Sequence, residues 1–117
     1  MSDFVIGQPA AIYWSDYGDG RAERTTIERD TKLYWIADGR KFRKTDGIEP
    51  GSGNNWGRIK YLLAINDPKV VQAEVAARKR YAYSRVVTAQ DHLAAHREDS
   101  EAIAALKAAL DAYAEVL

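Results

Sequence analysis

Apolar and polar residues alternate over short stretches in the first half of the chain, and alternation with a period of two is typical of β-strands. The clearest stretch is residues 32–47. Residues 33–36 favour strands, and the alternation resumes at residues 41–43. Between them, Asp38-Gly39 readily adopts the positive φ angles of a type I′ turn. We therefore predict a β-hairpin over residues 32–47.

Three other stretches have a strand-like pattern, at residues 10–14, 21–29 and 58–65. Turn-forming Gly, Asp, Asn and Pro residues lie between them, which predicts five short strands joined by turns. We expect the strands to form a small, strongly bent antiparallel sheet, an SH3-like β-barrel over residues 1–66. The largest apolar side chains on these strands are expected to form its core: Tyr13, Trp35, Ile36, Phe42, Tyr61 and Leu63.

The second half of the chain has apolar positions at steps of three and four residues, which is typical of helices. Asp67 can cap a first helix that starts at Pro68, and no Gly or Pro follows before about residue 97. Valines and the two tyrosines of Tyr81-Ala82-Tyr83 lower the helix propensity somewhat, which leaves a kink or break around residues 84–88 open. Residues 98–100 predict a hinge, with Asp99 or Ser100 capping a second helix.

These elements predict an α+β protein, with the barrel at residues 1–66 followed by a C-terminal helical hairpin at residues 67–117. The second helix carries an apolar stripe at heptad-like spacing. The stripe could fold back on the first helix, or it could pair with another copy of the chain. We take this stripe and one loop tryptophan as candidate protein-interface residues: Trp56, Ile103, Leu106, Leu110, Tyr113 and Leu117.

Composition adds limits to this picture. The 17 basic and 17 acidic side chains cancel, so no global field attracts nucleic acid or an anionic membrane. There is no cysteine, which excludes disulfides and thiolate metal sites and is compatible with a reducing compartment. We find neither a secretory signal pattern nor an apolar run approaching the roughly 18 residues of a membrane span. We expect a cytoplasmic protein that does not bind membranes.

Two local basic clusters offer the only sequence signal for nucleic acid. The first is on the hairpin, near Tyr34 and Trp35, and consists of Arg40, Lys41, Arg43 and Lys44. The second is in the first helix and consists of Arg78, Lys79, Arg80 and Arg85. Such clusters can hold phosphates while aromatic rings stack on bases. The alternative is a solvated or salt-bridged surface that keeps the protein soluble, and the balanced net charge favours it.

Catalytic and metal-binding patterns are incomplete. His92 and His96 lie one helical turn apart, which is a spacing that can hold zinc. However, Leu93 occupies the position where the metalloprotease pattern needs glutamate, and a third ligand would have to come from elsewhere. The loop around Gly51 and Gly53 lacks the lysine of a phosphate-binding loop and does not fit a nucleophile elbow. We therefore expect neither an enzyme nor a metal or other cofactor.

Several short motifs carry a family resemblance. They are Val5-Ile6-Gly7-Gln8, Gly39-Arg40-Lys41-Phe42 with Thr45-Asp46-Gly47 after it, Asn55-Trp56-Gly57, and the helical tail. In these the chain resembles small bacteriophage proteins, common in phages of actinobacteria and described as β-barrel domain proteins of unknown function. The resemblance covers about the first 70 residues and implies an accessory protein acting in the host bacterial cytoplasm. We thus expect a non-enzymatic module that binds a host or phage protein or itself, with nucleic-acid binding as the alternative.

Overall fold

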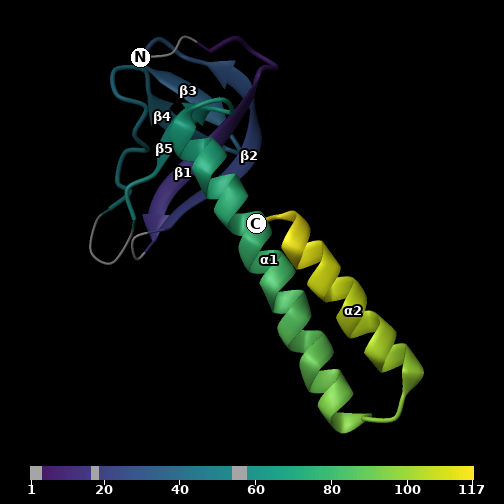
Figure 1. Ribbon diagram of the computed structural model, residues 1–117. Helices are drawn as coiled ribbons and strands as arrows, with labels where there is room; N and C mark the ends of the chain where they lie inside the picture. Colours follow the sequence, from purple (N-terminus) through teal and green to yellow (C-terminus); the bar gives the residue numbers. More distant parts are fainter. Residues whose placement is uncertain (1–3, 17–18, 54–57) are drawn as a thin grey trace. The chain divides into compact units, whose positions relative to one another are not determined.

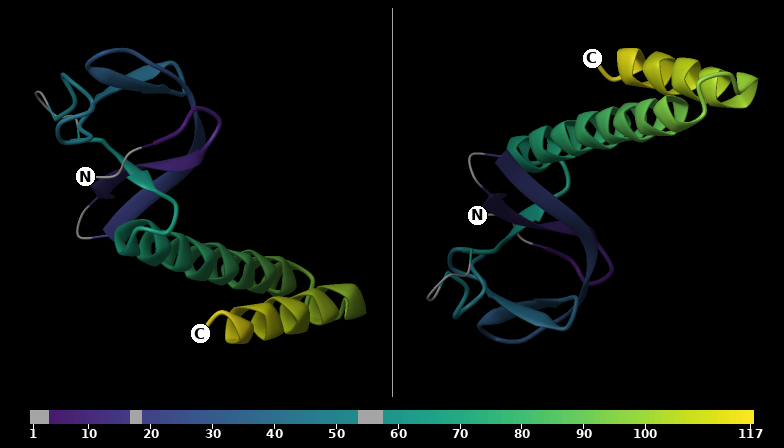
Figure 2. Two further views of the ribbon diagram at one scale, coloured as in Figure 1. Left: turned by 90° about the horizontal axis from the view of Figure 1, so that it is seen from above. Right: turned by 90° about the horizontal axis from the view of Figure 1, so that it is seen from below.

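The computed structural model describes residues 4–16, 19–53 and 58–117 (Figure 1). The chain divides into two compact units, Met1–Glu74 and Val75–Leu117. The first unit contains five strands and the start of helix α1, and the second contains the rest of α1 and helix α2. The predicted α+β class is confirmed. The strands form one antiparallel sheet that curls into a half-barrel (Figure 2).

The sheet has the strand order β4-β3-β2-β1-β5. Its strands are β1 (Pro9–Asp16), β2 (Asp19–Asp30), β3 (Tyr34–Ala37), β4 (Arg40–Arg43) and β5 (Tyr61–Ala64). The long strand β2 pairs with β1 along its first part and with β3 near its end. The register of the pairing with β3 shifts between Ile27 and Arg29, just after the pairing of β2 with β1 ends. Such a β-bulge bends a strand and increases its twist, which curls the sheet.

The central hairpin forms as predicted. β3 and β4 pair with Trp35 opposite Phe42, and the turn between them contains Asp38 and Gly39 with φ angles of 53° and 68°. Positive φ at both central residues is the geometry of a type I′ turn, whose twist matches that of the flanking strands. The amide of Gly39 also donates to Glu28 Oε1 at 3.1 Å, which ties the turn to β2.

The core lies on the concave face of the sheet and differs in part from the predicted one. Trp35 and Phe42 are buried as expected, but Tyr13, Tyr61 and Leu63 are only half-buried. Strands β1 and β5 pair with Ile12 opposite Leu62, and these two side chains share the inward face, whereas the residues next to them in sequence do not join the buried cluster. The buried cluster consists of Phe4, Ala10, Ile12, Ile27, Trp35, Ala37, Phe42 and Leu62.

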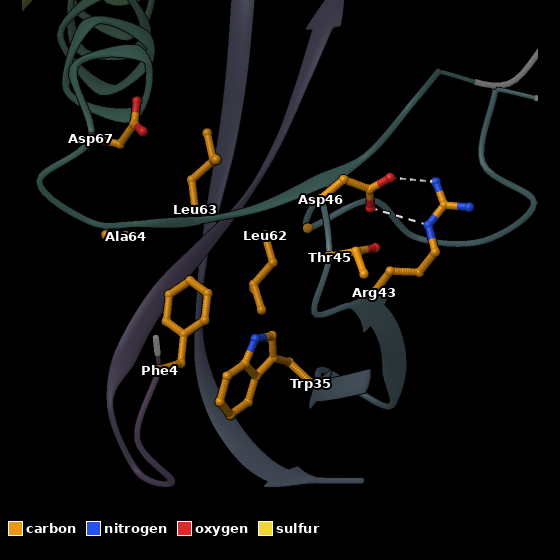
Figure 3. Close-up of a pocket in the computed structure, with 10 residues that line it drawn as sticks. Phe4, Trp35, Arg43, Thr45, Asp46, Leu62, Leu63, Ala64 and Asp67 are labelled. Carbon is orange, nitrogen blue, oxygen red and sulfur yellow. Dashed lines mark hydrogen bonds and ion pairs between the residues drawn. The ribbon is translucent and has the colours of Figure 1, made fainter. Parts of the chain in front are cut away.

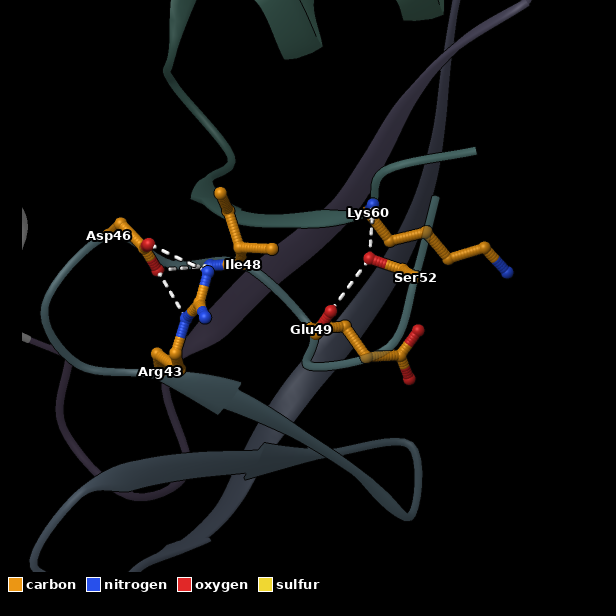
Figure 4. A network of polar contacts seen from close by, with 6 residues as sticks. All are labelled: Arg43, Asp46, Ile48, Glu49, Ser52 and Lys60. Atoms are coloured by element: carbon orange, nitrogen blue, oxygen red, sulfur yellow. Dashed lines mark hydrogen bonds and ion pairs between the residues drawn. The ribbon is translucent and has the colours of Figure 1, made fainter. Parts of the chain in front are cut away.

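The segment after β4 links the two edges of the curled sheet (Figure 4). The amide of Arg43 in β4 donates to Ile48 O at 3.0 Å, and the amide of Leu62 in β5 donates to Gly47 O at 2.8 Å. Ile48 also forms an isolated antiparallel bridge with Tyr61. A loop hydroxyl, Ser52 Oγ, adds a further link by accepting from the amide of Lys60 at 3.0 Å. Backbone groups on the edges of both β4 and β5 are thereby paired.

The helices begin where predicted. α1 spans Pro68–Ala95, and Asp67 Oδ1 accepts from the amide of Lys69 at 2.9 Å. α2 spans Ser100–Glu115, and Asp99 caps it by accepting from the amide of Glu101 at 2.9 Å. The kink left open near residue 84 does not occur, because α1 is one continuous helix. Within the described residues, neither helix is long and apolar enough to cross a membrane.

Each unit uses one part of α1. In the first unit, Arg24 of β2 forms a bidentate ion pair with Glu74 at 2.7 and 2.9 Å, and Val70 and Ala73 of the first turns are buried. In the second unit, α2 folds back along α1, and the rings of Tyr83 and Tyr113 lie 5.6 Å apart (Figure 1). The antiparallel hairpin predicted from the sequence is therefore confirmed within one chain.

Candidate interaction surface

The first unit contains a pocket of about 340 Å³ at the edge of its core (Figure 3). Phe4, Trp35 and Leu62 form its apolar side, and the rings of Phe4 and Trp35 meet edge to face at 5.6 Å. Arg43 and Asp46 form part of its polar side. The pocket is thus an opening into the core of the curled sheet, with one ion pair at its rim.

The polar groups of this pocket are engaged in structural contacts. Asp46 accepts from the amide of Ile48 at 3.0 Å and from Arg43 Nε and Nη2 at 3.1 and 2.9 Å (Figure 4). The hydrogen bond from the amide of Ile48 has the largest effect on the pKa of Asp46, and the hydrogen bonds from Arg43 add to it. Together they hold this pKa below its usual value. Asp67, also on the lining, caps α1. The two carboxylates on the lining are thus occupied by hydrogen bonds within the fold.

The basic cluster on the hairpin is brought together but largely neutralised. Arg40 pairs with Glu49 at 3.4 Å, Arg43 with Asp46 at 2.9 Å, and Lys44 with Asp30 at 2.7 Å. Two of its lysines also lie over aromatic rings, Lys41 Nζ at 4.9 Å from the centre of Tyr34 and Lys44 Nζ at 4.4 Å from that of Trp35. Trp35 is buried and cannot stack on a base. This cluster therefore fits the salt-bridged alternative better than a phosphate-binding surface.

The basic cluster on α1 has a different environment. Arg78, Lys79 and Arg85 are exposed and Arg80 is half-buried, and none of the four forms an ion pair within the described part of the chain. Tyr81 and Arg85 border a groove between α1 and α2, which His92 and Ala109 also line. Helical spacing places Arg78 and Arg85 on one face with Tyr81 between them, whereas Lys79 and Arg80 point elsewhere. The cations therefore do not share one surface.

The two histidines lie together on an exposed face near the end of α1. Their ring centres are 4.6 Å apart. Among residues 4–16, 19–53 and 58–117, no group of three His, Cys, Asp or Glu side chains could hold a metal ion. The pair lacks the third protein ligand that a zinc site requires.

The predicted apolar stripe on α2 separates into two parts in the structure. Leu106 and Tyr113 are half-buried against α1 together with the buried Ala102 and Ala109. The other three residues of the stripe follow each other at seven-residue steps and remain exposed: Ile103 at 41%, Leu110 at 47% and Leu117 at 73%. The hairpin thus closes through one part of the stripe and leaves the other open to solvent.

Three further apolar side chains on α1 are exposed in this unit. Tyr81, at 67%, borders the groove described above, while Tyr83 is 55% and Val87 37% exposed, and Tyr83 contacts Tyr113. We call Tyr83, Val87, Ile103, Leu110 and Leu117 the hairpin face. The sequence signal that could have indicated the α1 residues is their position next to the buried Ala82 and Val86. Trp56, the remaining interface candidate, lies outside the described residues.

Comparisons with models of known protein families, with characterised proteins and with solved structures found no match to this chain.

Proposed function

We propose that this protein is a non-enzymatic interaction module that binds another protein chain through the hairpin face. The observation that carries the proposal is the exposure of Ile103 and Leu110 on α2, whose other side already packs on α1, and of Leu117 just beyond the end of that helix. Clustered apolar side chains of this size on a surface usually mark an interface, whereas scattered ones need no explanation.

Helical spacing makes the hairpin face suitable for binding a helix. Residues seven apart lie on nearly the same line along a helix, so Ile103 and Leu110 form a ridge on α2, and Leu117 continues the same spacing just past the helix end. Burying a fully exposed Leu or Ile side chain contributes about 1.5–3 kcal/mol, so Ile103 and Leu110, which are already about half covered, each contribute less than this to binding. The pocket in the first unit and the basic cluster on the β-hairpin provide no comparable row of exposed apolar side chains.

The wider setting of this function is also a proposal. The five-stranded meander, in which β5 returns beside β1, supports an SH3-like barrel in the first unit. The motif resemblance to phage β-barrel domain proteins supports a viral accessory protein that acts in the cytoplasm of a bacterial host. In that setting the bound chain is a host protein, a phage protein or the same protein.

Affinity capture with matched variants tests the proposal. The immobilised chain is incubated with nuclease-treated bacterial lysate, as wild type, as Leu110→Asp and as Ala108→Asp. Ala108 is exposed on α2 outside the stripe, so this control introduces the same charge on the same helix. Proteins retained by the wild type and Ala108→Asp but lost with Leu110→Asp support the proposal. Retention unchanged in Leu110→Asp, with helix content preserved, would contradict it.

Nucleic-acid binding through α1 is the second candidate. It is favoured by one observation, that Arg78, Lys79, Arg80 and Arg85 have no ion-pair partner in the described ranges. Cations without protein partners are available for phosphates, and such binding weakens steeply as salt is added. The candidate ranks second because helical geometry distributes these four side chains around α1.

A further inference from the structure

We infer that the occupant of the hairpin face is a second copy of this chain, with its α2 antiparallel to the first, so that two helical hairpins form a four-helix bundle. This inference rests on the proposed function, because it names the partner of the same surface. It is argued from the repeat of the apolar residues, from their neighbours on α1 and from the charges beside them.

The exposed ridge is self-complementary. In an interface with two-fold symmetry, one patch must meet its own copy, so its apolar positions have to be symmetric about a centre. Leu110 is the midpoint of Ile103 and Leu117. An antiparallel second copy with its axis near Leu110 therefore places Ile103 of each chain near the C-terminal end of the other chain's α2, where Leu117 follows the last helical residue, Glu115. A repeat of seven residues is also the spacing that keeps a ridge facing its partner along the whole contact.

The neighbouring residues of α1 extend the same surface. Tyr83 lies level with Tyr113, as their ring contact shows, so the antiparallel α1 brings Val87 close to the level of Leu110. Tyr83 and Val87 are both exposed beside the ridge. The proposed axis therefore passes near the centre of the apolar residues on both helices, and both hairpins contribute two helices to the bundle.

The charges beside the ridge complement each other only between two antiparallel copies. Lys107 follows Ile103 by four residues and Asp111 follows Lys107 by four, so both lie along the edge of the ridge away from α1. Both are exposed, and neither forms an ion pair in the part of the chain that the structure describes.

The two-fold axis brings these opposite charges together. With the axis near Leu110, Lys107 of one copy and Asp111 of the other differ in level by about two residues, or roughly 3 Å. This distance is within the reach of a lysine side chain, and the symmetry forms the pair twice. A parallel second copy would instead align Lys107 with Lys107 and Asp111 with Asp111.

Charge reversal tests the inference with the purified full chain. We expect the wild type to have the mass of a dimer in multi-angle light scattering. Lys107→Asp gives this edge two acidic side chains, and Asp111→Lys gives it two basic ones. Each variant alone should dissociate roughly tenfold more readily than the wild type, because like charges then face each other across the axis. An equimolar mixture of the two should form a heterodimer as tight as the wild-type dimer.

The mixture separates the dimer from effects within one helix. If residues 107 and 111 acted only on each other within one α2, each substitution would weaken the dimer of its own variant. Mixing the two variants would then not restore the strength of the dimer. A wild type that is monomeric at all accessible concentrations, or variants that do not combine, would overturn the inference. The capture experiment with Leu110→Asp would still test the proposed function independently, because it detects partners other than the chain itself.

Discussion

The carbonyl oxygen of Gly47 accepts a hydrogen bond from the amide of Leu62 at 2.8 Å, while Gly47 has a φ angle of +76°. A Cβ atom at position 47 would lie 3.2 Å from the carbonyl oxygen of Leu62. Gly47→Ala should therefore lower the free energy of unfolding by about 1–3 kcal/mol, through the strained φ angle and the close contact together. Urea denaturation measures the change.

Gly39→Ala provides the matched control for that substitution. Gly39 also has a positive φ, +68°, but a Cβ atom there would meet nothing within 4 Å. The control should show the cost of the backbone conformation alone, so its effect should be smaller than that of Gly47→Ala. Equal effects would mean that the link between residue 47 and β5 contributes no steric constraint.

Phe42 is the largest fully buried side chain of the first unit. Phe42→Ala should destabilise the protein by about 3–5 kcal/mol, because the transfer free energy of the ring is lost and a cavity remains. Leu33→Ala on the same hairpin is the control, since Leu33 is 62% exposed and its truncation should change stability by less than about 0.5 kcal/mol. Chemical denaturation of both variants would decide; equal losses would contradict the observed core.

Local sequence signals predicted those parts of the fold that depend on neighbouring residues. The turn at Asp38-Gly39 and the caps Asp67 and Asp99 were read correctly, because each acts on residues at most two positions away. The predicted inward face of β1 and β5 is wrong at Tyr13, Tyr61 and Leu63. Both strands are apolar on both faces, so alternation alone does not choose between them, and the choice follows from pairing across the sheet.

The candidate site shows the same division. Helical spacing predicted the apolar stripe on α2, but it could not show which of its residues would pack on α1. That separation depends on the small buried residues Ala102 and Ala109, which place Leu106 and Tyr113 near α1 and leave Leu110 exposed. Two of the ion pairs that neutralise the basic cluster on the β-hairpin, Lys44 with Asp30 and Arg40 with Glu49, join residues 14 and 9 positions apart, so local sequence patterns do not predict them.

Asp46 should make stability depend on pH in the acidic range. Hydrogen bonds from Ile48 and Arg43 hold its folded pKa below the ordinary value of 3.8. A group with a lowered folded pKa stabilises the fold above its unfolded pKa, and this contribution disappears as the pH falls through the folded value. Asp46→Asn should thus be less stable at neutral pH and lose less stability on acidification. Denaturation across this range measures the difference, with Asp91→Asn, at an exposed position of α1, as control.

The two basic clusters should differ if the protein binds nucleic acid at all. Replacing Arg78, Lys79, Arg80 and Arg85 together by Gln should abolish binding to a DNA or RNA probe at low salt. Replacing Arg40, Lys41, Arg43 and Lys44 should affect it less, since three of these already have acidic partners. Fluorescence anisotropy over a salt series measures both. No complex of the wild type at low salt would eliminate this function.

The contact between α1 and α2 is made largely by short side chains, including Ala82, Ala102 and Ala109. An alanine side chain loses no rotamer entropy on burial, and it also removes little apolar area from water. Both the cost and the gain of docking α2 are therefore small, which sets its local opening free energy below that of the strands. Amide hydrogens of residues 100–115 should accordingly exchange early in the isolated chain, and a bound partner would be recorded as slowed exchange along this one helix.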